Sequence, residues 1–223
     1  MRRTNDGARV GGAWLAVASS LMIAGVALHG PIAPDLAEQM TKIANGPTVW
    51  SVSHWITAAG LSLLTVAALI VLTSGSHLTE GWWTTTAWAV LAVTSLWILT
   101  TAVAEATVVT NAAVSGNAEM FEAWWAFAEG KATGVAFLAL AVALIAANDA
   151  QSAQRATPAW SAWTGMVAGV ASFSGWALGM WFDLRLGSLL WVGSTILMSA
   201  WTVWFGVALA RSSASDIPAA AAR

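Results

Sequence analysis

The chain has 223 residues, of which 58% are hydrophobic and 9% are charged, and its formal net charge is −2. Soluble domains carry about 25% charged residues, so this chain has too few charges to cover a soluble surface. It lacks the basic footprint of nucleic-acid binding, and the absence of cysteine excludes disulfides, thiolate-held clusters and CxxC zinc sites. These features predict an integral membrane protein whose main partner is the lipid bilayer.

Six apolar segments follow one another along the chain, and a membrane-spanning helix needs about 20 such residues. The predicted spans are residues 11–30, 48–74, 82–108, 121–147, 158–182 and 187–210. The predicted fold class is therefore all-α, a polytopic six-helix transmembrane bundle over residues 11–210. Residues 1–10 are expected to form a cytoplasmic segment, and the Ser- and Ala-rich residues 211–223 a disordered cytoplasmic tail.

The connection between the first two spans predicts a short interfacial helix. Leu36, Met40 and Ile43 recur at helical spacing and give this segment one apolar face. The sequence Asn45-Gly46-Pro47 is expected to end the helix, because Gly and Pro interrupt regular structure. We expect the first span to be retained, since its apolar stretch exceeds the 7–15 residues usual in a signal peptide.

The fourth span admits two interpretations, because the apolar stretch of residues 132–147 is short and follows three charged residues. We favour one continuous helix over residues 121–147, with Glu122, Glu129 and Lys131 in its first turns. The alternative is a short span from residue 132, preceded by an amphipathic helix on the membrane surface.

Positive charge on short loops marks the cytoplasmic side of a membrane protein. With six spans, one side carries six arginines: Arg2, Arg3, Arg9, Arg155, Arg211 and Arg223. The opposite loops carry only Lys42 and Arg185. Both termini are therefore predicted to be cytoplasmic. Most of the 16 tryptophans fall near the ends of the predicted spans, as the aromatic belts of membrane proteins do.

The ionisable side chains of the predicted spans gather in the outer half of the bundle once the direction of each helix is considered. They are His29, His54, Glu105, Glu122, Glu129 and Lys131. A charge in hydrocarbon costs at least about 2.5–3.5 kcal/mol, so such groups usually face a cavity, a ligand or each other. We therefore predict a polar pocket that opens toward the outer face. A position at the membrane interface is the least satisfactory explanation for Glu129, because this residue is predicted to lie deeper in the membrane than an interfacial one.

Three functions are consistent with these residues. The favoured hypothesis is that the pocket binds or transports a small ligand, an ion or a proton. In the second, His29 and His54 ligate haem b or join the carboxylates around a metal ion in a redox subunit. In the third, the polar groups are structural, and the chain is a structural subunit of a larger membrane complex or a homo-oligomer. Its G-x-x-x-G pairs permit close helix approach, either within the bundle or at a dimer interface.

Common catalytic patterns are absent from the sequence, which contains no Walker, GxSxG, HExxH or Rossmann motif. An enzymatic function is therefore not favoured. We predict no catalytic residue and no required cofactor, with haem b or a metal ion as the alternative.

Overall fold

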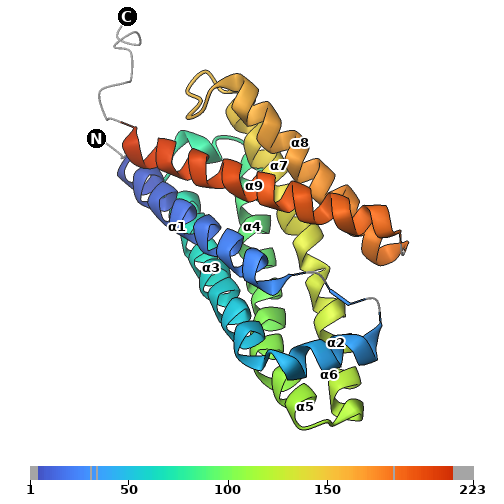
Figure 1. Ribbon diagram of the computed structural model, residues 1–223. Coiled ribbons are helices and arrows are strands. Elements are labelled where there is room, and N and C mark those ends of the chain that lie inside the picture. Colours follow the sequence, from blue (N-terminus) through green and yellow to red (C-terminus); the bar gives the residue numbers. More distant parts are fainter. Residues whose placement is uncertain (1–4, 31, 34, 183, 213–223) are drawn as a thin grey trace, which may run out of the picture.

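The computed structural model describes residues 5–30, 32–33, 35–182 and 184–212, except for the side chains of residues 5 and 129–132. The regular structure of these residues is entirely helical (Figure 1). Five segments are long and apolar enough to cross a membrane: Asp6–His29, Pro47–Thr73, Trp82–Val114, Gly134–Gln151 and Arg185–Arg211. The chain is therefore an all-α, multi-pass membrane protein, as its composition predicts.

The first helix, α1 (Asn5–His29), begins within the predicted N-terminal segment, so residues 5–10 are helical rather than a separate extension. The short helix α2 (Leu36–Asn45) starts at Asp35, whose carboxylate accepts a hydrogen bond from the Glu38 N–H at 2.7 Å. Gly46 ends α2, and α3 (Pro47–Thr73) follows at once because proline is well tolerated in a first helical turn.

The third membrane-crossing segment is longer than the predicted range of 82–108. After a single 3₁₀ turn, His77–Thr79, helix α4 (Trp82–Ala104) continues through a π-helical segment, η2 (Glu105–Val109), into α5 (Thr110–Val114). At about 1.5 Å per residue this segment is roughly 50 Å long. It therefore exceeds the ≈30 Å hydrocarbon core of a bilayer and extends beyond it.

The fourth predicted span differs from the single helix expected over residues 121–147. The structure has two helices, α6 (Ala118–Ala132) and α7 (Gly134–Gln151), interrupted at Thr133. Glycine has low helix propensity, and Gly134 lies against Trp97 and Ile98 of α4, where an added Cβ would make tight contacts at 3.0–3.3 Å. The membrane-crossing part begins at Gly134, which is closer to the alternative interpretation.

The last helices are α8 (Ala159–Trp176), which continues as the π-helix η3 (Ala177–Trp181), and α9 (Arg185–Arg211). Helix α8 covers the predicted fifth span but is not among the five segments apolar enough to cross a membrane. Its sequence holds three Ser, three Gly and three Trp residues, which lower its hydropathy. The structure thus supports five membrane-crossing helices by composition rather than six.

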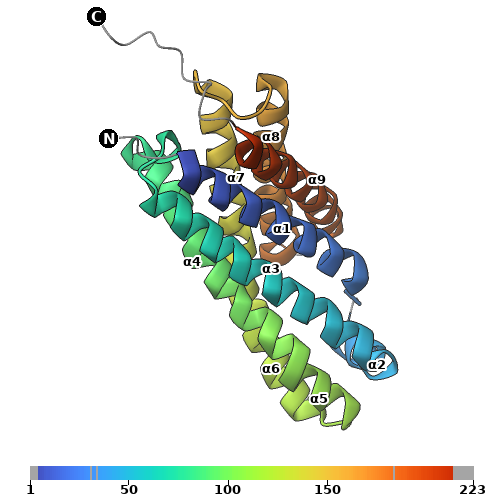
Figure 2. The ribbon, with the colours of Figure 1, turned by 90° about the vertical axis from the view of Figure 1, so that its left-hand side faces the viewer.

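The long helices form a closed ring in the order α1, α3, α4, α7, α8 and α9, with α9 packed back against α1 (Figures 1 and 2). The Arg9 Nε donates to the Ala210 carbonyl at 3.3 Å, so the start of α1 and the end of α9 lie together. Helices α2, α5 and α6 form the opposite end of the molecule, which we name the α2 end.

Candidate functional site

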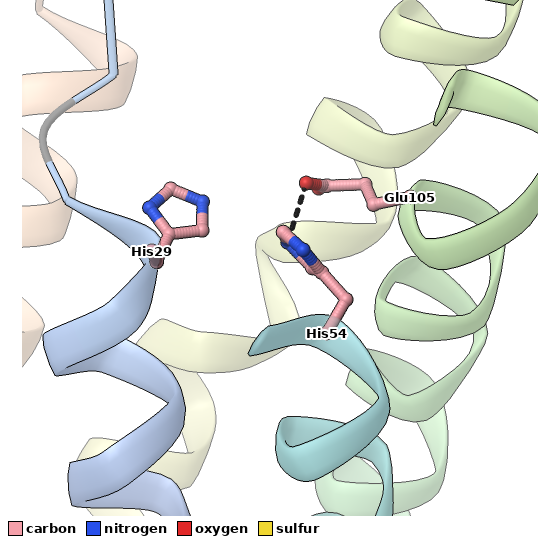
Figure 3. A group of neighbouring side chains, drawn as sticks. All are labelled: His29, His54 and Glu105. Carbon is pink, nitrogen blue, oxygen red and sulfur yellow. Dashed lines mark ion pairs between the residues drawn. The ribbon is translucent and has the colours of Figure 1, made fainter. Parts of the chain in front are cut away.

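The structure brings together His29, His54 and Glu105 at the α2 end, from three different helices (Figure 3). His29 is the last residue of α1, and Gly30 ends that helix in the left-handed conformation with φ +67°. The His29 Nδ1 lies 2.7 Å from the Gly30 carbonyl oxygen. Because a carbonyl only accepts, Nδ1 carries the hydrogen, and the neutral ring keeps its lone pair on Nε2.

His54 lies two turns into α3 and is held in the same way. Its Nδ1 donates to the Trp50 carbonyl at 2.8 Å, one turn earlier in the helix. Its Nε2 lies 2.7 Å from the Glu105 Oε2, and the two side chains are 7% and 13% exposed. Since Nδ1 already holds one hydrogen, this short contact needs a second proton, carried either by the imidazole or by the carboxyl group.

Glu105 occupies the first position of the π-helix η2. Single π-turns inside α-helices are frequent at functional sites, since they alter which way the side chains point. Two hydroxyl groups accompany the altered backbone: Thr110 Oγ1 donates to the Glu105 carbonyl at 2.7 Å, and Ser51 Oγ donates to the Ala106 carbonyl at 2.9 Å. Ser51 belongs to α3, so the helix that carries His54 also contacts the backbone beside Glu105.

An aromatic side chain, Trp50, packs against both histidines. Its ring centroid lies 4.5 Å from that of His29 and 4.6 Å from that of His54. The indole is 4% exposed, and its Nε1 has no hydrogen-bond partner within the described residues. The Lys42 Nζ lies 5.6 Å from the centre of the same ring, a cation–π distance. Partial burial lowers the pKa of Lys42, which belongs to α2 outside the membrane-crossing segments.

Helix α2 covers this region through its apolar face. Ile43 of α2 is buried in a cluster with Trp50, Phe121 and Trp125, together with Val109, Ala112 and Ala113 of the π-helix and α5. Leu36 and Met40 pack on the edge of the cluster. The predicted apolar face of this short helix therefore contacts protein. The cluster includes Trp50, which packs against both histidines.

A metal ion fits the donor set of these three residues better than haem does. Their ligand atoms lie within 4.8 Å of one another, the only such group found in the described part of the chain. The His29 and His54 ring centroids are 5.1 Å apart. Two axial imidazoles with metal–nitrogen bonds of about 2 Å would need ring centres roughly 6 Å apart. The rings as they lie therefore leave no room for a porphyrin between them.

Of the other predicted site residues, Glu122 does not join this group. Glu122 is exposed on α6, whereas its helix neighbours Phe121 and Trp125 are buried, so the carboxylate lies away from the cluster. The side chains of Glu129 and Lys131 lie outside the described part of the structure. The predicted contribution of Glu129 to a polar pocket is therefore not tested. The candidate site consists of His29, His54 and Glu105.

Two contributions escaped the sequence analysis. Trp50 is predicted there as a membrane-interface residue, yet it packs inside the site; its spacing of four residues from His54 was the available signal. Asp149 is 3% exposed and accepts hydrogen bonds from the Ala156 N–H, the Thr157 N–H and the Thr157 hydroxyl. It holds the connection between α7 and α8, far along the chain from the three site residues.

A separate open groove runs between α8 and α9 and is lined mainly by apolar side chains. Its residues are Trp163, Thr164, Val167, Ala168, Ala171, Leu189, Leu190, Gly193, Ser194 and Leu197. None of the predicted site residues lines it. This groove is therefore not the polar pocket expected from the sequence.

Comparison with protein-family models, with curated proteins and with solved structures gave no match.

Proposed function

We propose that the protein binds a small cation at His29, His54 and Glu105, in the outer half of a six-helix membrane bundle. The observation that carries this proposal is the short contact between His54 Nε2 and Glu105 Oε2, beside a second imidazole and within otherwise apolar helices. Two imidazole nitrogens and a carboxylate are all donors of electron pairs. Such a group is suited to a positively charged ligand, of which the proton is the smallest.

The arrangement of the chain supports six passes with α8 as the sixth. The start of α1 and the end of α9 lie at the same end of the bundle, and this requires an even number of crossings. Helix α8 packs along α7 on one side and α9 on the other, so protein covers much of its polar surface. The excess of arginine at the end that holds the termini favours a cytoplasmic position for both. The α2 end then faces outward, with α2 at the membrane interface.

The two competing functions have less support. A haem between His29 and His54 would require the two rings to move apart from their 5.1 Å separation. A purely structural role would be expected to leave an ion pair in this position. It does not explain why a second imidazole, that of His29, lies beside the same pair, with no hydrogen-bond partner for its Nε2 among the described residues.

The test is thermal unfolding of the purified protein in detergent against a panel of cations. A cation that binds the native state raises the melting temperature in proportion to the logarithm of its concentration above Kd. The panel contains Na⁺, K⁺, Mg²⁺, Ca²⁺ and Zn²⁺ as chlorides, and a series of pH values for the proton. We expect at least one cation to stabilise the wild type and to lose that effect in Glu105→Gln.

Glu122→Gln is the matched control, since it makes the same change on an exposed surface. It should keep the response of the wild type. If neither a metal cation nor a change of pH moves the melting temperature differently in the wild type and in Glu105→Gln, the proposed function is wrong.

A further inference from the structure

We infer that the cation is a single divalent transition-metal ion, bound by His29 Nε2, His54 Nε2 and a carboxylate oxygen of Glu105. This inference rests on the proposed function and narrows it to one chemical class. The juxtaposition of the three side chains is drawn in Figure 3.

The donor types select the class of ion. Imidazole nitrogens suit Zn²⁺, Cu²⁺, Fe²⁺ and Ni²⁺, whereas Mg²⁺ and Ca²⁺ prefer sites built wholly from oxygen. Two histidines and one carboxylate form a set that first-row transition metals use repeatedly. The chain has no cysteine, so no thiolate competes for the ion or shifts the preference toward softer metals.

The hydrogen bonds behind the two histidines point to the same conclusion. Metal-ligating histidines usually donate their other ring N–H to a carbonyl or carboxylate, which fixes the tautomer and the ring orientation. The Nδ1 of His29 donates to the Gly30 carbonyl, and that of His54 donates to the Trp50 carbonyl. Both rings therefore present Nε2 as the ligand atom. A histidine with only a packing role has no need of this shared arrangement.

The distances require only a small adjustment. Ligands that bind one ion at about 2.0–2.2 Å lie roughly 3–3.5 Å from one another in a tetrahedral site. The largest separation among the present ligand atoms is no more than 4.8 Å, and His54 and Glu105 are at 2.7 Å. The ion would separate the latter pair slightly and draw in His29. His29 ends its helix beside Gly30, and Glu105 begins a π-turn, so both positions can accommodate such a shift.

Three protein ligands leave a coordination position open. Structural zinc sites are closed by four protein ligands, whereas sites that exchange a ligand keep one position for water or a substrate. His29 and Glu105 are both partly exposed, while His54 is buried. We therefore assign the centre to an exchangeable ion site rather than to a closed structural one.

The nearby charges set the electrostatic balance of the site. Among the described residues, Glu105 is the one carboxylate of the site. The Lys42 ammonium lies over the ring of Trp50, which packs against both histidines. Partial burial lowers the pKa of Lys42, because desolvation disfavours the charged ammonium form.

The experiment is a metal titration of the full-length protein in detergent after treatment with a chelator. Zn²⁺ binding is followed by calorimetry, and Co²⁺ binding by visible absorption, since its d–d bands report the coordination geometry. We expect one ion per chain and at least a tenfold loss of affinity in His29→Gln and in Glu105→Gln. His77→Gln and Glu122→Gln alter the same residue types elsewhere and should bind as the wild type does.

The inference is overturned if Zn²⁺ and Co²⁺ show no saturable binding to the wild type, a result that does not depend on any variant folding. It is also overturned if correctly folded His29→Gln, judged by circular dichroism and gel filtration, keeps wild-type affinity. If Na⁺, Ca²⁺ or acid alone stabilises the wild type through Glu105, the proposed function stands and the transition-metal inference falls. If no cation acts, both are wrong.

Discussion

At the scale of single residues, one hydroxyl group links the backbone of Glu105 to the next turn of its helix. Thr110 Oγ1 donates to the Glu105 carbonyl at 2.7 Å, across five residues, which matches the wider turn of a π-helix. Thr107 donates to the Val103 carbonyl at 2.6 Å, across the four residues of an ordinary α-turn. Both threonine hydroxyls thus donate to a backbone carbonyl in the same continuous helical segment. Only Thr110 bonds to the backbone of a site residue, Glu105.

We predict that Thr110→Val lowers stability by about 1 kcal/mol, the usual net contribution of one hydrogen bond. It should also weaken Zn²⁺ binding several-fold, because the Glu105 backbone loses a restraint. Calorimetric titration of the purified variant measures the affinity, and circular dichroism measures the melting temperature.

Thr107→Val should also cost about 1 kcal/mol, because it loses one hydrogen bond, and for a chain of this size this lowers the melting temperature by about 2–4 °C. Its Zn²⁺ affinity should equal that of the wild type. Equal Zn²⁺ affinities in the two variants would contradict a positioning role for Thr110.

At the scale of the elements, close contacts at glycine fix how the helices cross. Gly12 of α1 and Gly206 of α9 face each other, and a Cβ on Gly206 would lie 2.6 Å from the Gly12 carbonyl oxygen. Gly165 lies against Trp201, and Gly169 lies against Ala139 and Ala143 of α7. Small residues allow membrane helices to approach closely. At these positions the partners belong to the same chain, so the G-x-x-x-G pair of α8 serves packing within the bundle.

Gly206→Ala is predicted to destabilise the protein by about 1–3 kcal/mol, as overpacking of a tight contact does. The added methyl group would meet backbone atoms of α1, which cannot move away as a flexible side chain can. Thermal unfolding in detergent measures the effect as a loss of several degrees in melting temperature.

Gly193→Ala is the matched control in the same helix, because a Cβ there would meet nothing within 4 Å. Alanine has the higher helix propensity, by about 1 kcal/mol, so this variant should be as stable as the wild type or more stable. If Gly206→Ala has the same melting temperature as Gly193→Ala, α1 and α9 do not cross at Gly206 as described.

At the scale of the whole molecule, the closed ring of six long helices determines which loops share a side of the membrane. If α8 crosses, the connection after α5 and the connection between α8 and α9 lie on the same side. If α8 does not cross, the α8–α9 connection lies on the opposite side, with the α7–α8 loop. The chain contains no cysteine, so single cysteines can be introduced without removing any.

We predict that Ser115→Cys and Leu184→Cys react with a membrane-impermeant maleimide on intact cells, and that Gln154→Cys reacts only after permeabilisation. All three positions are exposed and lie outside the membrane-crossing helices. Protection of Leu184→Cys together with Gln154→Cys would reduce the crossings to five. Inversion of the whole pattern would reverse the orientation.

The sequence by itself determined the class of the protein, because hydropathy and charge are sums over local segments. The long uncharged stretches around His54 and Trp88 lie in helices close to their predicted bounds. The sequence also identified His29, His54 and Glu105 as ionisable groups within apolar segments. It predicted α2 from the spacing of Leu36, Met40 and Ile43.

The sequence could not show which of the four described candidate side chains, those of His29, His54, Glu105 and Glu122, meet in the folded protein. Contact depends on the rotation of each helix and on the π-turn at Glu105, and neither follows from hydrophobic period alone. Beside the break at Thr133, Gly134 packs against Trp97 and Ile98 of α4, a contact between residues far apart in the chain. The rotation of α6 leaves Glu122 exposed beside the buried Phe121, while Glu105 contacts His54.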